Sequence, residues 1–117
     1  MSRASELLKL PGVVSAGVFS RKGFVEEFEG ALSEAEVAEM MELCAALTMT
    51  MEMQGRLLDR LPGQSGWSAH GWMTWGPEWA VVTVYDGTCI VQGRQAPFNR
   101  LIEAMTDAAG TELIKPF

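Results

Sequence analysis

The chain has 117 residues, of which 48% are hydrophobic and 21% are charged, and 9 Lys and Arg against 15 Asp and Glu give a formal net charge of −6. Domains of about 100–150 residues are typical, so we expect one domain over residues 1–117. The high apolar fraction excludes a disordered chain. The acidic balance and the scattered basic residues argue against nucleic-acid binding, which needs clustered Lys and Arg.

The sequence also argues against a membrane protein. No run approaches the ~20 consecutive apolar residues that span a bilayer, and no helix face gathers the cations of a membrane-surface helix. Pro11 and Gly12 interrupt the first apolar stretch, which makes a poor signal peptide. Cys44 and Cys89 have no C-x-x-C spacing and form no disulfide framework. We therefore expect a cytoplasmic protein with reduced thiols.

The first third of the chain predicts a short helix and a hairpin. Residues 4–10 favour a helix, which the Pro11-Gly12 pair ends. Residues 13–19 and 24–28 are rich in Val and Phe, and turn residues lie between them. This pattern is typical of two strands joined as a hairpin.

A long helix is predicted from Ser33 to Arg60. Ser33 and Glu36 have the spacing of a capping box, and good helix formers follow until Pro62. At about 1.5 Å per residue the helix is ~40 Å long, which spans or overhangs a compact domain with a radius of gyration near ~13 Å. Residues 48–53 alternate with the period of a strand, but no helix breaker precedes Pro62, so helix is favoured.

The remaining elements predict an α+β fold. Three strands follow, over residues 70–75, 79–85 and 88–93. Asp86-Gly87 is a strong hairpin signal between the last two strands. A final helix is predicted to begin at Pro97 and end near Gly110. The order α-β-β-α-β-β-β-α predicts a five-stranded antiparallel sheet with helices packed on its faces.

The long helix carries two apolar faces. One stripe is expected to lie on the sheet, and it comprises Val37, Met40, Cys44, Leu47, Met51 and Leu58. A second set repeats on the opposite side, at Met41, Ala45, Met49 and Met53. We predict that this second set forms a homodimer interface, to which the edge strand over residues 70–75, with Trp72, contributes. The alternatives are coverage by another part of the same chain and a Met-lined groove for a ligand or a peptide.

Residues 67–79 hold all four Trp and the only His of the chain. Trp is favoured at interaction hot spots, where a large ring and one polar group are buried together. The run therefore marks a candidate partner or ligand site at Trp67, His70, Trp75 and Trp79. The alternative is that alternate Trp side chains belong to the core and to cross-strand pairs of a hairpin.

No catalytic residue, metal ligand or cofactor site is predicted. Nucleophilic catalysis needs a base beside the nucleophile, and His70 is the only histidine. Metal sites need clustered His, Cys or carboxylate groups, and such a cluster is missing from the sequence pattern. The glycine spacings of dinucleotide-binding loops and P-loops are both absent. The sequence therefore favours a non-enzymatic protein.

The opening segment LLKLPGVVSAGVFSRKGFVEEFEG resembles the first helix and hairpin of roadblock/dynein light chain domains. The matching residues are Pro11, Gly12, Val13, Ala16, Gly17 and Gly23. CAALTMTMEMQG, over residues 44–55, and FNRLIEAM, over residues 98–105, are similar to an uncharacterised bacterial branch. The resemblance covers residues 4–109. It implies a roadblock/profilin-like α/β sandwich, with the long helix on one face and two shorter helices on the other, that homodimerises through the long helix and the edge strand.

The resemblance also implies a class of function. Members of the family are generally not enzymes, and they act as dimeric platforms in dynein, in lysosomal signalling scaffolds and as regulators of small Ras-like GTPases in bacteria. This implies a homodimeric interaction or regulatory module, with a small GTPase as the candidate partner. The alternative is an accessory domain that binds a small molecule, or a redox or metabolic enzyme, through the Trp/His segment or the Met-rich helix.

Overall fold

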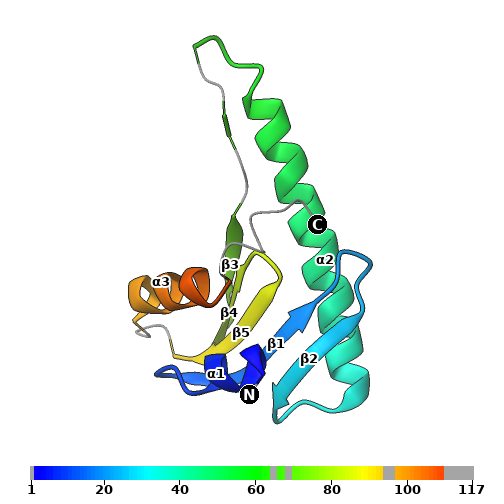
Figure 1. The fold of residues 1–117 in the computed structure, drawn as a ribbon, viewed down its shortest axis with the longest axis vertical. Helices are drawn as coiled ribbons and strands as arrows, with labels where there is room; N and C mark the ends of the chain where they lie inside the picture. Colours follow the sequence, from blue (N-terminus) through cyan, green and yellow to red (C-terminus); the bar gives the residue numbers. More distant parts are fainter. Residues whose placement is uncertain (1, 64–65, 68–69, 94–96, 110–117) are drawn as a thin grey trace.

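The computed structural model of the chain describes residues 2–63, 66–67, 70–93 and 97–109. A five-stranded sheet lies between one long helix and two shorter helices (Figure 1). The elements are α1 (Arg3–Leu8), β1 (Val13–Phe19), β2 (Val25–Gly30), α2 (Glu34–Leu58), β3 (Gly71–Trp75), β4 (Trp79–Val84), β5 (Gly87–Gln92) and α3 (Phe98–Ala109). The predicted order and the α+β class are confirmed.

The strands are antiparallel and follow the order β2-β1-β5-β4-β3, so β2 and β3 are the edges of the sheet. The β4–β5 turn differs by one residue from the prediction, because Val84 pairs with Gly87 and the turn residues are Tyr85 and Asp86. Tyr85 takes a φ of 56° there. Two-residue hairpin turns need left-handed backbone, and in this turn Tyr85 supplies it instead of a glycine.

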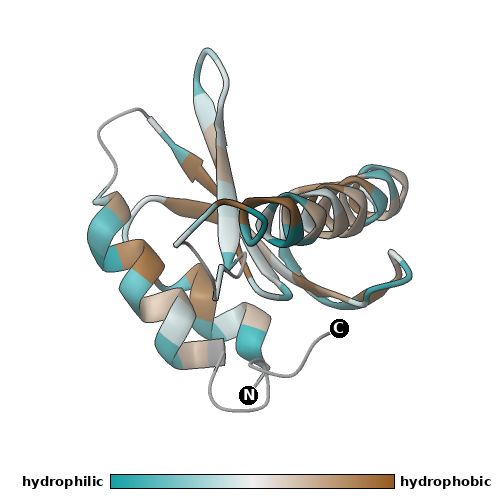
Figure 2. Ribbon diagram, turned by 90° about the horizontal axis from the view of Figure 1, so that it is seen from above, coloured by the Kyte–Doolittle hydropathy of each residue, from teal (hydrophilic) through white to brown (hydrophobic). Residues whose placement is uncertain are grey.

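Each face of the sheet has its own apolar core. On one face, α1 and α3 pack against the sheet through buried residues that include Leu7, Leu101 and Met105. On the other face, α2 packs through Val37, Met41, Cys44 and Ala45 onto Phe19 of β1. Figure 2 shows α2 on one side of the sheet and the two shorter helices on the other.

The start of α2 follows the predicted capping box. Ser33 Oγ accepts a hydrogen bond from the backbone N–H of Glu36 at 3.2 Å, and a Glu36 carboxylate oxygen accepts one from the backbone N–H of Ser33 at 2.9 Å. The helix continues for 25 residues without a break. Its C-terminal half projects past the sheet and lengthens the molecule, whose extents are 45 × 30 × 29 Å (Figure 1).

Candidate interaction surface

The projecting part of α2 and the residues after it, here called the α2 arm (residues 49–61), present apolar side chains to solvent. Met49 is 45% exposed, Met53 is 55% exposed and Leu57 is 52% exposed. These residues recur every four positions, so they lie in one row along the helix. Leu61, just past the helix end, is 49% exposed and extends the apolar surface. An exposed apolar row of this length is unusual on a monomer surface, which makes it a candidate interaction surface.

The predicted division of α2 into two faces is wrong for Met41 and Ala45. Both are buried on the sheet side of the helix, at 0% and 5% exposure, together with Val37 and Cys44. The buried face is therefore centred between the two predicted stripes, and Met41 and Ala45 are covered by the sheet of their own chain. Met49 and Met53 are the members of the predicted interface set that remain exposed on α2.

The edge strand β3 is attached to the start of the α2 arm. The indole Nε1 of Trp72 donates a hydrogen bond to Thr48 Oγ1 at 3.3 Å, and Trp72 is half-buried. Farther along the arm, the backbone N–H of Trp67 donates to Asp59 Oδ1 at 2.9 Å. The start of β3 therefore contacts α2 at Thr48, next to the arm, and Trp67, which precedes β3, contacts the arm at Asp59.

The two edges of the sheet differ in charge. The sequence of β2 is VEEFEG, so its edge carries Glu26, Glu27 and Glu29. The sequence of β3 is GWMTW, without any charged residue. Charged side chains on an edge strand prevent it from pairing with another strand, whereas an uncharged edge remains open to pairing. Of the two edge strands, β3 is thus the one better suited to pair with a strand of another chain.

The structure does not gather the predicted Trp and His side chains into one site. Trp75 packs edge-on against Phe98 of α3, with ring centroids 5.7 Å apart. His70 lies at the other end of β3, where its Nδ1 is 3.0 Å from the hydroxyl of Tyr85. Trp67 lies beside the α2 arm and Trp79 begins β4. The predicted set is thus distributed along the hairpin and over both faces of the sheet.

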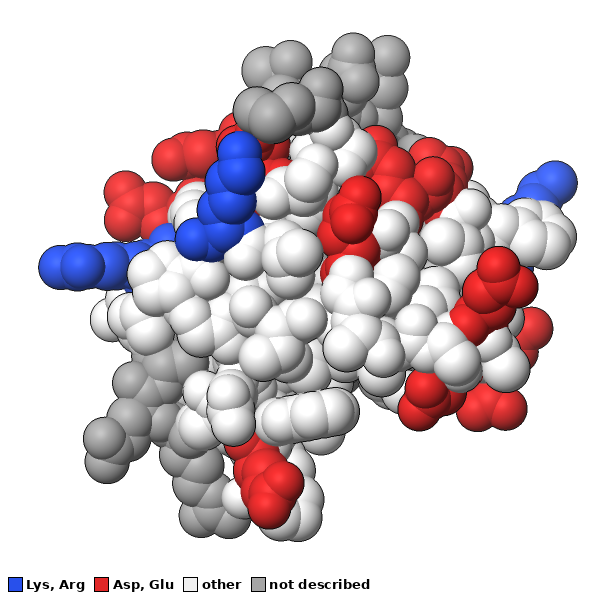
Figure 3. Space-filling model, turned by 90° about the horizontal axis from the view of Figure 1, so that it is seen from below, with Lys and Arg blue, Asp and Glu red and all other residues white. Residues whose placement is uncertain are grey.

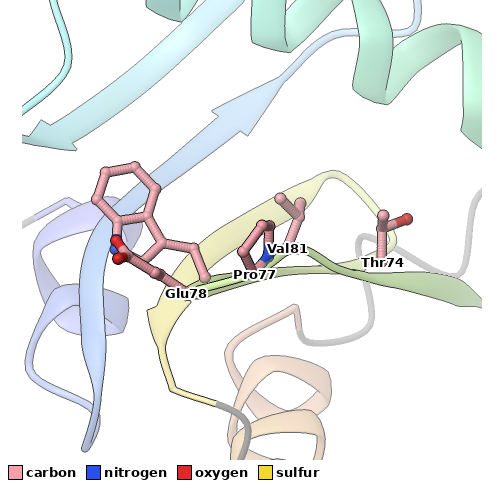
Figure 4. Close-up of a pocket in the computed structure, with 6 residues that line it drawn as sticks. Thr74, Pro77, Glu78 and Val81 are labelled. Atoms are coloured by element: carbon pink, nitrogen blue, oxygen red, sulfur yellow. The ribbon is translucent and has the colours of Figure 1, made fainter.

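Trp79 instead contributes to a cavity on the β3–β4 hairpin, here called the hairpin cavity. Its volume is about 650 Å³, and its lining comprises Thr74, Gly76, Pro77, Glu78, Trp79 and Val81. Figure 4 shows Thr74, Pro77 and Val81 on the side of the hairpin that faces α2. Sequence reasoning missed this cavity, because Gly76-Pro77-Glu78 indicates only a strand break.

A second cavity, here called the α3 cavity, lies on the opposite face of the same hairpin. Its volume is about 470 Å³, and its walls come from β3, β4 and α3, with His70, Gly71 and Met73 on one side and Ile102 and Thr106 on the other. Both cavities therefore adjoin the open edge of β3, one on each face of the sheet.

The two thiols are unsuited to nucleophilic chemistry. Cys44 and Cys89 are fully buried, each at 0% exposure. Burial raises the pKa of the Cys89 thiol to about 12 and also raises the pKa of Cys44. Because the thiolate is the reactive form, both side chains act as apolar core groups.

The described residues hold no cluster of three or more side chains that could bind a metal ion. Within that same part of the chain, every helix is too short or too polar to cross a membrane. On the face shown in Figure 3, acidic side chains surround a broad uncharged area and basic side chains are few.

Several solved structures share the fold of this chain. The Roadblock/LC7 domain from Streptomyces avermitilis is 18% identical with a TM-score of 0.74, and the match covers 97% of this chain and 96% of that one. The gliding protein MglB from Thermus thermophilus is 17% identical with a TM-score of 0.72, covering 92% and 81%. An MglB with a tetrameric arrangement is 18% identical with a TM-score of 0.73, covering 92% and 80%.

These likenesses establish that the chain has the roadblock fold, as its sequence resemblance implied. No curated protein matches the sequence. A family model does match it, over residues 3–107, and the chain belongs to that family, which is described as "Uncharacterized conserved protein (DUF2173)".

Proposed function

We propose that the chain is a non-enzymatic interaction module that works as a homodimer, joined through the α2 arm and the open edge of β3. The observation that carries the proposal is the exposed row of Met49, Met53 and Leu57 on a helix bonded to an uncharged edge strand. Two-fold dimers are the commonest oligomers, and they pair one surface with its own copy. An apolar row next to an open strand edge suits such self-pairing.

The hairpin cavity supports the same arrangement. An antiparallel pair of β3 strands brings the Gly71 end of one strand beside the Trp75 end of the other. The α2 arm lies beside the Gly71 end, where Trp72 bonds to Thr48. The hairpin cavity lies at the Trp75 end, on the face of the sheet that carries α2. A second copy therefore lays its arm across this cavity and buries apolar side chains there.

A small Ras-like GTPase is the partner that we propose for the dimer. The support is the roadblock fold, shared with two MglB structures and a Roadblock/LC7 domain, together with the family resemblance of the sequence. One of those MglB structures has a tetrameric arrangement, so that protein associates with itself. Both thiols of the present chain lie in the core, which leaves neither of them available as a nucleophile and favours a binding role over catalysis.

The dimer is tested by light scattering coupled to gel filtration. We expect the purified chain to have twice its mass of 12.8 kDa, and we expect Met53→Glu to be monomeric because the charge enters the apolar row. Phe24→Glu is the matched control, since Phe24 is 67% exposed but lies in the β1–β2 turn. A monomeric wild type, or a Met53→Glu variant that stays dimeric, overturns the proposed interface.

The partner is tested by affinity capture from the native extract with the tagged chain. Stoichiometric recovery of a Ras-like GTPase, reduced with Met53→Glu and retained with Phe24→Glu, is the expected result. The next assay is then the rate of GTP hydrolysis with and without the purified chain. Recovery of only a metabolic or redox enzyme contradicts the GTPase proposal and favours the accessory-domain alternative.

The hairpin cavity is the observation that favours a second candidate function, the binding of a small apolar molecule. Its volume of about 650 Å³ is within the usual range of ligand pockets, about 300–1,000 Å³, and Trp79 forms part of its wall. A fluorescence change upon adding a ligand, lost in Trp79→Phe, supports this function. A dimer whose hairpin cavity is already closed argues against it.

A further inference from the structure

The backbone groups that face the open edge of β3 can be identified from its bonds to β4. The backbone N–H of Tyr85 donates to the carbonyl of His70 at 2.8 Å, and the N–H of Gly76 donates to the carbonyl of Trp79 at 2.7 Å. In an antiparallel ladder, bonded residues alternate along each strand. The even-numbered residues from His70 to Gly76 therefore bond to β4. The N–H and C=O groups of Gly71, Met73 and Trp75 point to the open edge.

A second β3 strand can pair with this edge in only a few registers. Identical antiparallel strands are related by a two-fold axis perpendicular to the sheet, so residues that face each other must lie on the same face. Only the odd-numbered residues of β3 direct their backbone N–H and C=O groups to the open edge. An odd-numbered residue of one copy must therefore face an odd-numbered residue of the other. The two-fold axis then passes between the two copies of Trp72, of Met73 or of Thr74. Only the register centred on Met73 uses the open groups of Gly71, Met73 and Trp75 in both copies.

We propose that two copies pair in the register centred on Met73, so that Trp75 of each copy faces the partner's Gly71. This inference rests on the proposed homodimer and specifies how its strands meet. It also places Trp75 of each copy at the mouth of the partner's α3 cavity, which Gly71, Met73 and His70 help to line. The cavity is thus completed by the second copy.

The side chains at these positions are complementary. Trp75 is 53% exposed, so its indole retains a large apolar surface to bury. Gly71 has no side chain to fill the sheet face, and it cannot acquire one, because a Cβ there would collide with the backbone carbonyl oxygen of Thr83. An aromatic residue facing an edge glycine covers the gap that the glycine leaves. The Met73 register thus places the exposed indole of Trp75 over the bare backbone of the partner's Gly71, once in each copy.

Cysteine cross-linking distinguishes the registers. In the Met73 register the two Met73 residues face each other with Cα atoms about 5.5 Å apart, within reach of a disulfide. The two Thr74 residues are then diagonal neighbours about 7–8 Å apart, which is beyond that reach. We expect Met73→Cys to form a disulfide dimer under mild oxidation at least about tenfold faster than Thr74→Cys. Faster cross-linking of Thr74→Cys, or of Trp72→Cys, overturns the register.

Two measurements on the wild-type chain keep the test independent of the variants. Amide hydrogen exchange is expected to show protection of Gly71, Met73 and Trp75 that increases with protein concentration. A register centred on Trp72 gives Trp75 no facing residue within β3 of the other copy, and one centred on Thr74 gives Gly71 none, so we expect weaker protection of that amide in each case. Light scattering on the same sample distinguishes failure of the proposed homodimer from failure of the proposed register. A monomer overturns the homodimer itself, whereas a dimer with another protection pattern overturns only the register.

Discussion

The indole Nε1 of Trp72 donates a hydrogen bond to Thr48 Oγ1 across 3.3 Å, and this bond joins the edge strand β3 to α2 where the arm begins. Thr48 is buried at 9% exposure and Trp72 is half-buried. The two elements that we propose for the dimer surface are therefore fixed to each other within one chain. In the proposed dimer, a second copy would meet two elements that are already held together, which lowers the entropic cost of association.

This bond is expected to contribute to stability. Trp72→Phe removes the N–H donor but keeps an aromatic ring, and Thr48→Val replaces the acceptor with a methyl group. Net contributions of single hydrogen bonds are about 0.5–1.5 kcal/mol, and we expect a coupling energy of that size between the two changes. Urea unfolding at one protein concentration, on the wild type, both single variants and the double variant, measures it. Additive single effects show that the bond has no energetic role.

Gly17 is expected to be intolerant of a side chain because α2 packs directly on it. A Cβ at this position collides with the terminal methyl of Met41, and it lies 3.2 Å from the carbonyl oxygen of Glu27 and 3.3 Å from Cδ2 of Phe28. Overpacking of this kind costs about 1–3 kcal/mol, so we expect Gly17→Ala to lower the free energy of unfolding by that amount. Combined with Met41→Ala, it should cost less than the sum of the two single changes. Strict additivity in urea unfolding contradicts the contact.

Local signals in the sequence were sufficient to predict the elements. The capping box at Ser33 and Glu36 begins α2, because a cap acts on the backbone within a few residues, whereas the helix ends at Leu58, before the predicted end at Arg60 and the Pro62-Gly63 pair. The turn at Tyr85 was misplaced by one residue, because the register of β4 against β5 decides which residues form it. Register depends on contacts along both strands and is only partly encoded in the turn itself.

The candidate surface was predictable only in part. Met49 and Met53 follow from helical spacing, but Met41 and Ala45 were assigned to the wrong face. Apolar residues occur around most of α2, so its sequence does not define one buried side, and the packing of the helix on the sheet decides which residues are covered (Figure 2). Trp75 and Trp79 are close in sequence, but strand alternation and the intervening turn place them on opposite faces.

The capping box predicts a specific pH dependence. The hydrogen bond from the backbone N–H of Ser33 lowers the pKa of Glu36 from its ordinary value of 4.5. A lowered pKa in the folded state means that the contribution of Glu36 to stability is fully present above pH 4.5 and is lost as the pH falls through the lowered pKa. Glu36→Gln removes this titration. The difference in the free energy of unfolding between wild type and Glu36→Gln should therefore be smaller at acidic pH than at neutral pH. Urea unfolding over this range measures it.

Glu39→Gln is the matched control for this experiment. It removes the same charge three residues farther along α2, outside the capping box that Ser33 and Glu36 form. The helix N-terminus favours negative charge most strongly within its first turn. We therefore expect a smaller pH-dependent difference for Glu39→Gln than for Glu36→Gln. Equal pH profiles for the two variants attribute the effect to overall charge instead of the cap.

The two buried thiols are expected to respond differently to the same substitution. Cys44 Sγ lies 4.0 Å from Thr83 Oγ1, which donates to Thr88 Oγ1 at 2.9 Å, so a serine hydroxyl at position 44 has polar neighbours. Cys89 lies in the apolar core with Val82 and Val91, and a hydroxyl there stays unpaired at a cost of about 1–3 kcal/mol. We therefore expect Cys89→Ser to lower the free energy of unfolding more than Cys44→Ser, with the two alanine variants as volume controls. Equal losses in urea unfolding contradict this account, because the polar neighbours of Cys44 then provide no compensation.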